Sequence, residues 1–333
     1  MNGLQICIVL VCYFHLYLLS ISLTNLMNYT LHQLAIFEKI ASLRSVTKAA
    51  EAMFLSQPAV SIQLKNFQNQ FSVSLFEVIG RQVYITEFGE EIAVAARKIL
   101  EEAQAITYSS QIYEGKVAGK LKIAIVSTAK YAMPHLLSDF IRQHDAVDLV
   151  MDVTNKAAVL KSLENNEADL AMVSTIPKKL DIERIELMKN KLFLVAGKDV
   201  QVKNGPISKK VFENLPLIFR EQGSATRIAM EKYIASNKFI TSKRMELTSN
   251  EAVKQAVIAG LGVSIMPLIG IKNPLATHDL KIIQAKGLPI ESHWNLIWLK
   301  SKNQSVVVKA FIEYLQEHKA ALIKEHFGWF EEY

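Results

Sequence analysis

The chain has 333 residues, of which 50% are hydrophobic and 21% are charged. This composition is that of a globular protein with room for two or three domains, and it excludes an intrinsically disordered chain. The formal net charge of +6 permits an anionic partner but does not require one. Both cysteines, Cys7 and Cys12, lie at the start of the chain, which excludes a disulfide framework or a cysteine-based metal site in the remainder and suits a reducing compartment.

The segment 1–26 is a hydrophobic leader. Its stretch Ile6–Leu23 has the length of a short membrane span. However, residues 1–26 contain no Lys or Arg, so the basic beginning of a secretory signal is missing. Met27 directly precedes the first amphipathic helix, and we expect that translation begins there and that the leader is a mis-assigned upstream extension. A true membrane anchor is the alternative.

The next segment has the pattern of a helix-turn-helix. Apolar residues in Leu31–Ala41 recur at steps of three and four, which predicts a helix with one buried face. Ser45 is placed to cap a second short helix, Val46–Met53, and Ser56 is placed to cap a third. Pro58 falls in the first turn of this third helix, where its missing N–H costs nothing. Its inward positions are predicted to be Val60, Leu64 and Phe67.

A wing and a long helix follow. The tripeptide Gly80-Arg81-Gln82 predicts a turn between two short strands, the second being Val83–Ile85, and Thr86 is placed to cap the long helix. Along that helix, apolar residues recur every seven positions, with small residues four positions later, which predicts a close seam with a second copy of the helix. The seam comprises Ile92, Ile99, Ile106 and Tyr113 with Ala96, Ala103 and Ser110. The alternative is a helix packed on its own domain.

Beyond residue 115 short aliphatic runs alternate with helical segments. This alternation predicts parallel sheets covered by helices, and the overall class is therefore α/β. The expected strands are Leu121–Val126, Leu149–Val153, Leu170–Val173, Leu192–Ala196, Leu217–Phe219 and Val263–Met266. The expected helices are Met133–Gln143, Ala157–Asn165, Lys209–Asn214, Thr226–Ser236, Glu251–Ala259 and a final helix Val306–His326.

The third helix has amide and hydroxyl side chains where a solvated helix usually carries charges. The major groove of DNA admits a helix, and base edges are read by amides and hydroxyls as well as by arginine. Gln57 and Gln63 are expected to read bases, Ser56 and Ser61 to reach phosphates or base edges, and Pro58 to touch a thymine methyl group. Residues expected beside the phosphates are Thr47, Lys48, Lys65 and Arg81. The alternative is a small helical domain whose polar surface is incidental.

A second candidate site lies between strands and helices of the α/β region. Ser127, Thr128 and Lys130 follow a strand and precede a helix, and this is a favourable place for an anion or a polar ligand. The run Ser127–Lys130 also matches the S-x-x-K motif of penicillin-binding enzymes, but the S-D-N and K-T-G partners of that motif are absent. We therefore predict no enzymatic activity and no cofactor or metal site.

Two further loops are expected to converge on the same cleft. Ser224 and Thr226 lie between a strand and a helix, Arg220 just before them is suited to pair with a carboxylate or phosphate, and Asn250 opens another helix. Ligands of open α/β sheets bind at the carboxyl ends of the strands. The predicted effector site is therefore Ser127, Thr128, Lys130, Arg220, Ser224, Thr226 and Asn250.

Longer stretches resemble a known family. FEKIASLRSVTKAAEAMFLSQPAVS and SLFEVIGRQVYITEFGE are similar to the winged helix-turn-helix of LysR-type transcriptional regulators. STAKYAMPHLL, FREQGSATRIAMEKY and RMELTSNEAVKQAVIAGLG look most like the CbbR group, which regulates carbon dioxide fixation operons. The resemblance covers about 27–315. Departures are Ile62 where Arg is common, Val78-Ile79 before the wing, and Gln222 and Ala225 in the effector loop.

The resemblance implies an architecture. Residues 27–89 would form a winged helix-turn-helix DNA-binding domain, 90–114 a dimerisation linker helix, and 119–325 a two-lobed effector domain like a periplasmic binding protein. Lobe I would comprise about 119–197 and 268–325, and lobe II about 198–267. The match of motifs also places Ser127, Thr128, Lys130, Ser224, Thr226 and Asn250 in the effector pocket. By the same match Thr47, Gln57, Pro58, Ser61 and Arg81 would be DNA contacts.

It also implies partners. These are a double-stranded DNA operator, a homodimer that assembles into a homotetramer, RNA polymerase, and a small effector that is a phosphorylated metabolite or a reduced nicotinamide nucleotide. The expected function is a cytoplasmic regulator of carbon dioxide fixation (RuBisCO and Calvin cycle) genes, in which the ligand changes the angle between the lobes. The alternative is a membrane-tethered or exported solute-binding protein, which would have no use for the helix-turn-helix.

Overall fold

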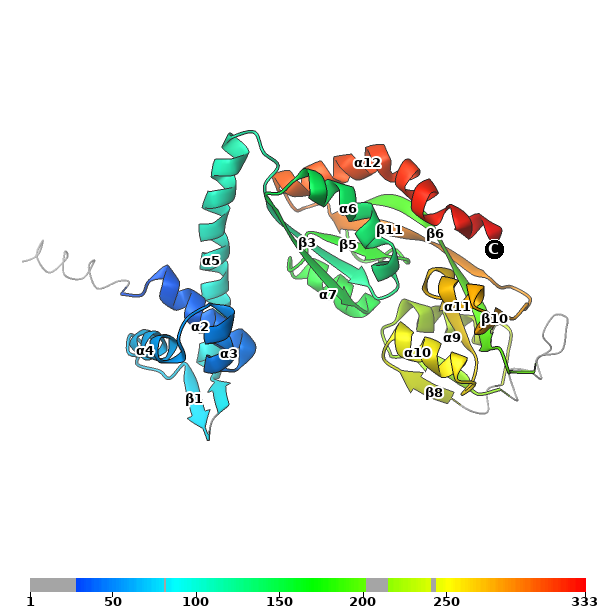
Figure 1. The fold of residues 1–333 in the computed structure, drawn as a ribbon, viewed down its shortest axis with the longest axis horizontal. Coiled ribbons are helices and arrows are strands. Elements are labelled where there is room, and N and C mark those ends of the chain that lie inside the picture. The colour runs from blue at the N-terminus through cyan, green and yellow to red at the C-terminus, as the bar shows by residue number, and fades with distance from the viewer. Residues whose placement is uncertain (1–27, 81, 202–214, 241–243) are drawn as a thin grey trace, which may run out of the picture. The chain divides into compact units, whose positions relative to one another are not determined.

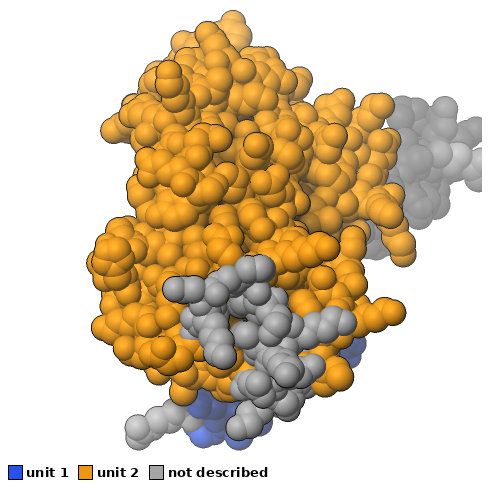
Figure 2. All heavy atoms as spheres, turned by 90° about the vertical axis from the view of Figure 1, so that its right-hand side faces the viewer, with its two compact units in different colours: residues 1–109 blue, residues 110–333 orange. Residues whose placement is uncertain are grey.

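The structure is a computed structural model that describes residues 28–80, 82–201, 215–240 and 244–333. The leader 1–26, Arg81 and the expected helix Lys209–Asn214 lie outside the described residues. The chain divides into two compact units, residues 1–109 and 110–333, which have separate colours in Figure 2.

Three helices form the core of the first unit. Helix α2 (Leu31–Leu43) begins with a reciprocal capping box between Thr30 and Gln33, and α3 (Val46–Ala52) begins at the cap Ser45. Helix α4 (Gln57–Gln68) begins at the cap Ser56. The side chains of Val60, Leu64 and Phe67 are buried as the pattern predicted. The helix-turn-helix that the sequence indicates is therefore present.

The wing follows this core. Strands β1 (Phe76–Ile79) and β2 (Gln82–Ile85) pair antiparallel, and Gly80 between them has a φ of +65°, which favours glycine. The hydroxyl of Thr86 then accepts a hydrogen bond from the Gly89 amide at 3.0 Å and caps the long helix α5 (Glu87–Tyr113).

Helix α5 divides into two parts by burial. Ala93 and Ala96 are buried in the core of the first unit and Ile92 packs against that core, so the first heptad of the predicted seam packs on its own domain. Later seam positions have no such cover, because Ile106 is 74% exposed and Tyr113 is 96% exposed within one chain. The dimer seam predicted from the heptads therefore has accessible apolar residues only in the later turns.

A mixed seven-stranded sheet organises the second unit, with the order β10-β6-β11-β5-β3-β4 and β9 paired to β6. Strand β3, next to the edge strand β4, pairs parallel with β4 and β5, but β6 pairs antiparallel with β9, β10 and β11. The expectation of parallel sheets is therefore wrong for the part of the sheet around β6, because β9, β10 and β11 all run antiparallel to this strand. The strands are β3 (Gly119–Val126), β4 (Val147–Thr154), β5 (Leu170–Val173), β6 (Ile182–Gly197), β9 (Ser264–Pro267), β10 (Leu280–Ile282) and β11 (Ile290–Leu299).

The parallel part of the sheet forms a first lobe with its helices. Figure 1 shows α6 and α12 on one face of β3 and β5 and α7 on the other. The rings of Phe140 on α6 and Phe311 on α12 lie 5.1 Å apart and join these two helices. The helices are α6 (Met133–Gln143), α7 (Lys156–Glu164) and α12 (Val306–Phe327), and η1 (Ala129–Tyr131) and η3 (Gly328–Glu332) are short 3₁₀ turns.

A second lobe packs around the other end of β6. Strands β7 (Leu217–Arg220) and β8 (Arg244–Leu247) pair parallel, and α9 (Ala225–Ser236) and α10 (Asn250–Ile258) pack beside them. A turn η2 (Leu268–Gly270) and α11 (Lys272–Ala276) follow β9. Ile283 is buried in the core of the second lobe, so part of the segment 268–325 packs there. Strands β6 and β11 run between the two lobes (Figure 1).

Candidate functional site

The first candidate site is the exposed surface of the helix-turn-helix. Most of the residues that the sequence assigns to DNA contact are exposed there: Thr47, Lys48, Ser56, Gln57, Pro58 and Lys65. Ser61 is half-buried. The Gln57 side-chain amide donates a hydrogen bond to the Ser61 hydroxyl at 3.2 Å, one helical turn further along α4. The side chains assigned to base reading at the start of α4 are thus held together before any DNA is bound.

Gln63 lies in a different environment. It is half-buried, and its side-chain oxygen accepts a hydrogen bond from the Gln33 amide at 3.2 Å. Gln33 also belongs to the capping box of α2, where its own side-chain oxygen accepts from the Thr30 amide at 3.0 Å. Gln63 therefore ties α4 to α2. Arg81, which the sequence places at the tip of the wing, lies outside the described residues.

The two most exposed of the large apolar side chains in the helix-turn-helix are Phe54 and Ile62, and no DNA contact is predicted for either. Phe54, in the turn between α3 and α4, is 98% exposed and has a φ of +55°. Ile62, on α4, is 59% exposed at the position where arginine is common in similar chains. Their exposure adds apolar contact area beside the polar side chains assigned to DNA contact.

The second candidate site lies between the two lobes and contains a hydrogen-bonded cluster. Ser127 follows β3 in the first lobe, Arg220 ends β7 in the second lobe, and Asn250 begins α10. The Ser127 hydroxyl accepts hydrogen bonds from the Arg220 guanidinium at 3.1 Å and from the Asn250 amide at 3.2 Å. The Arg220 guanidinium also donates to the Asn250 side-chain oxygen. Three residues predicted separately from the sequence therefore form one network across the lobes.

Arg220 already pairs with a carboxylate of its own chain. It is buried, and its guanidinium donates two hydrogen bonds to the Glu221 carboxylate, at 2.8 and 2.9 Å. A guanidinium with this many partners is a structural tie. Pairing with a carboxylate or phosphate of a ligand would require it to exchange one of these bonds.

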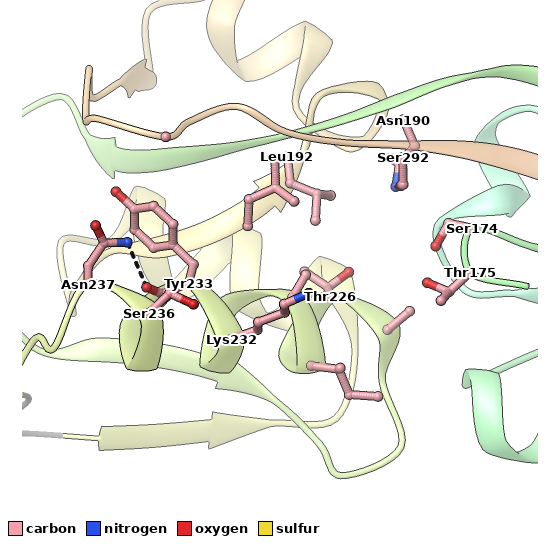
Figure 3. Close-up of a pocket in the computed structure, with 15 residues that line it drawn as sticks. Ser174, Thr175, Asn190, Leu192, Thr226, Lys232, Tyr233, Ser236, Asn237 and Ser292 are labelled. Carbon is pink, nitrogen blue, oxygen red and sulfur yellow. Dashed lines mark hydrogen bonds between the residues drawn. The ribbon is translucent and has the colours of Figure 1, made fainter.

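A cavity of about 490 Å³ lies next to α9 and is lined by a second group of polar side chains. In Figure 3, Thr226 and Lys232 from α9 lie on one side, Asn190 and Ser292 lie on the opposite wall, and Ser174 and Thr175 lie at one end. Among the described residues that line it, Lys232 alone carries a charge at neutral pH. The cavity therefore suits a small anion with groups that accept hydrogen bonds from hydroxyls and amides.

Only Thr226 of the predicted effector residues lines this cavity. Ser224 instead caps α9, where its hydroxyl accepts from the Arg227 amide at 3.5 Å. Thr128 is buried and Lys130 is half-buried next to the ring of Tyr131, with its ammonium 5.1 Å from the ring centroid.

Four cavity residues from the first lobe and the connecting strands were missed. Ser174 and Thr175 directly follow the buried strand β5, which is the same signal that singled out Ser127. Asn190 and Ser292 lie on β6 and β11, and the Asn190 amide donates to the Ser292 hydroxyl at 3.2 Å. These two depend on the pairing of strands far apart in the chain, for which the sequence carries no local signal.

A winged helix-turn-helix followed in the chain by a two-lobed unit with an interlobe cavity defines a ligand-responsive DNA-binding regulator. Two family matches identify the family of regulators. Residues 31–90 match the bacterial regulatory helix-turn-helix protein, lysR family, and residues 114–320 match the LysR substrate binding domain. The chain belongs to the LysR family of transcriptional regulators.

Two relatives are similar over most of their length. The HTH-type transcriptional activator CmpR of Synechocystis sp. is 38% identical over 304 residues, which are 89% of this chain and 97% of CmpR. The RuBisCO operon transcriptional regulator of Allochromatium vinosum is 34% identical and covers 89% of this chain and 98% of its own. These relatives are regulators and not enzymes, and they support the regulator and not the solute-binding alternative.

Two solved structures are similar in fold. The CcmR regulatory domain of Synechocystis PCC6803 in complex with 2-PG is 32% identical, with a TM-score of 0.56, over 59% of this chain and 95% of that domain. Full-length CbnR complexed with its target DNA is 20% identical, with a TM-score of 0.65, over 86% of this chain and 99% of CbnR, and shows the fold alone. None of the helices in the described part of the chain is both long and apolar enough to cross a membrane.

Proposed function

We propose that this LysR-type regulator controls genes of carbon dioxide fixation in response to a small phosphorylated metabolite. The observation that carries the proposal is the cavity beside α9, where Lys232 is surrounded by neutral hydroxyl and amide side chains. One lysine with many uncharged donors suits an anion that also has hydroxyl or carboxylate groups. The relatives that regulate RuBisCO operons support the control of carbon dioxide fixation genes, and the CcmR domain in complex with 2-PG supports a small-molecule ligand.

The first unit would bind the DNA. Gln57, Ser61 and Pro58 at the start of α4 would meet base edges, whereas Thr47, Lys48, Lys65 and Arg81 would lie against phosphates. A homodimer formed through the later turns of α5 would present two such helices, and two dimers would assemble into a tetramer that contacts RNA polymerase. Such a protein would act in the cytoplasm, where it reaches the chromosome.

The link between the two sites is the angle between the lobes. The cluster of Ser127, Arg220 and Asn250 ties the lobes together. A ligand that contacts Thr226 and Lys232 on α9 and Ser174 in the first lobe would favour a separation of the lobes different from the one in this structure. The difference in its affinity for the two separations would be the coupling free energy passed to the DNA-binding heads.

Footprinting of the region upstream of the protein's own gene, with and without 2-PG, tests the proposal. We expect a protected site whose length or pattern changes when 2-PG is added. Lys232→Met should keep the footprint but abolish its response to 2-PG. Lys309→Met, which removes an exposed lysine on α12, is the matched control and should respond like the wild type. If the protein binds no upstream fragment better than scrambled duplex, the proposed function is refuted. A reduced nicotinamide nucleotide tested in parallel distinguishes a nucleotide effector from a phosphorylated metabolite.

A further inference from the structure

A second cavity lies on the second unit, and it shares no lining residue with the cavity beside α9. Its volume is about 330 Å³, which is sufficient for a small metabolite. Four basic side chains line it, and we call it the basic pocket: His135 on α6, Lys254 on α10, Lys272 on α11 and His326 on α12. No predicted site residue and no part of the helix-turn-helix contributes to it.

The charges in the basic pocket are not balanced. Among the described residues that line it there is no carboxylate. Lys254 pairs with Glu251, one turn earlier on α10, at 2.7 Å. Lys272 has no carboxylate within 4.0 Å in the described part of the chain, and its ammonium instead lies 4.6 Å from the ring centroid of Trp329. The pocket therefore presents at least one cation that lacks a counter-charge.

Two imidazoles and an aromatic wall complete the basic pocket. The ring centroids of His135 and His326 lie 4.7 Å apart with the rings tilted by 37°, and both side chains line the pocket. The only carboxylate that the described residues place near His326 is that of the exposed Glu325, at 4.0 Å. Phe327 and Trp329 supply apolar surface beside these donors.

We propose that the basic pocket binds a small organic phosphate as a second ligand of this regulator. A phosphate dianion accepts several hydrogen bonds at once, so it can satisfy Lys272, Lys254 and the two imidazoles, whereas a single carboxylate would satisfy only part of them. The aromatic wall accommodates the organic part of the molecule. This site is additional to the cavity beside α9 and does not depend on which ligand binds there.

The position of the basic pocket gives its ligand a regulatory effect. His135 and His326 belong to helices of the first lobe, whereas Lys254 belongs to α10 of the second lobe. A phosphate that contacts both groups would hold the lobes together on this side. Helix α10 also begins at Asn250, which belongs to the cluster with Ser127 and Arg220, so the same helix connects the basic pocket to that cluster. A ligand in the basic pocket is thus expected to stabilise the arrangement of lobes seen here.

Isothermal titration calorimetry on the full chain with phenyl phosphate as the probe tests this inference. Phenyl phosphate combines a dianion with an aromatic group, and benzyl alcohol is the uncharged control. We expect the wild type to bind phenyl phosphate and not benzyl alcohol. Lys272→Met and His326→Gln should each weaken phenyl phosphate binding about tenfold or more, because each removes a hydrogen bond to a charged group. Lys309→Met should leave it unchanged.

The variant Lys232→Met separates this site from the cavity beside α9. Phenyl phosphate binding that survives Lys232→Met and is lost in Lys272→Met locates the ligand in the basic pocket. Binding that is lost only in Lys232→Met, binding that is equal in all variants, or no binding by the wild type at millimolar probe would each overturn the inference. Because Lys272 is exposed, its replacement does not endanger the fold, and the assay contains no DNA, so its outcome is independent of the proposed function.

Discussion

The Arg220 guanidinium donates a hydrogen bond to the Ser127 hydroxyl at 3.1 Å and thereby connects the last residue of β7 in one lobe to the residue after β3 in the other. Arg220 is buried and also bonds to Glu221 and Asn250. Buried polar groups of this kind stabilise a structure only while all their partners are present. The arrangement of the lobes thus depends on a small, fully paired cluster.

Ser127→Ala is expected to weaken this connection. The change removes one acceptor from both Arg220 and Asn250 and leaves buried donors unpaired, which costs about 1–3 kcal/mol of unfolding free energy. Ser138→Ala is the matched control, because the Ser138 hydroxyl bonds only within α6, to the His135 carbonyl oxygen at 3.3 Å. The denaturant midpoint of each variant measures the effect. Equal midpoints for the two variants would show that the cluster does not stabilise the unit.

Gln57→Ala is expected to weaken binding to the operator selectively. An amide that reads a base contributes about 1–3 kcal/mol of discrimination, so the loss should appear at the operator and not on random duplex. Lys65→Ala should instead weaken both equally and lower the slope of log affinity against log salt by about one. Fluorescence anisotropy with both duplexes over a range of salt concentrations measures these quantities. A loss for Gln57→Ala of the same size on random duplex would remove Gln57 as a base reader.

The elements that the sequence predicted well are those with local signals. The caps Ser45, Ser56 and Thr86 fix the beginnings of three helices by accepting hydrogen bonds from amides three residues later, and a short window of sequence contains both partners. Strand β11 was missed because its partners lie on β5 and β6, roughly a hundred residues or more earlier, so no short window of sequence contains the pairing.

In the candidate site, too, residues with a local signal were predicted and residues placed by long-range packing were not. The sequence could single out Ser127 and Thr226 because each lies between a strand and a helix. It could not indicate Lys232, which is an ordinary lysine in the middle of α9 and faces the cavity only because of how α9 packs against β6 and β11. The role of a residue in the middle of an element depends on long-range packing, which a single sequence does not contain.

The Glu251 carboxyl is expected to titrate below its usual range. Hydrogen bonds from Lys254 and then from Gln255 lower the pKa of Glu251. Because the folded pKa is depressed, this pairing stabilises the fold at pH values above the unfolded pKa of about 4.3 and the stabilisation is lost as the pH falls through the folded value. Lys254→Met should therefore raise the pKa of Glu251 and lower stability at neutral pH but not in acid.

Carboxyl NMR titration measures the pKa, and chemical denaturation at several pH values measures the stability. Since the Glu251 side chain is 49% exposed, the loss at neutral pH should be below about 1 kcal/mol. Lys309→Met is the control and should leave the Glu251 titration in place. An unchanged Glu251 titration in Lys254→Met would contradict the assignment of the shift to this ion pair.

Ile106→Glu is expected to disrupt the proposed dimer. Ile106 occupies the predicted seam of α5 and is 74% exposed in a single chain, so dimerisation would bury it against a second helix. A glutamate there would be buried without a partner, which should weaken dimerisation by about a hundredfold or more. Thr107→Glu adds the same charge to the next residue of α5, which lies off the heptad positions, and should leave the dimer intact. Sedimentation equilibrium of both variants measures the association, and a monomeric Thr107→Glu or a dimeric Ile106→Glu would show that the subunits associate through another surface.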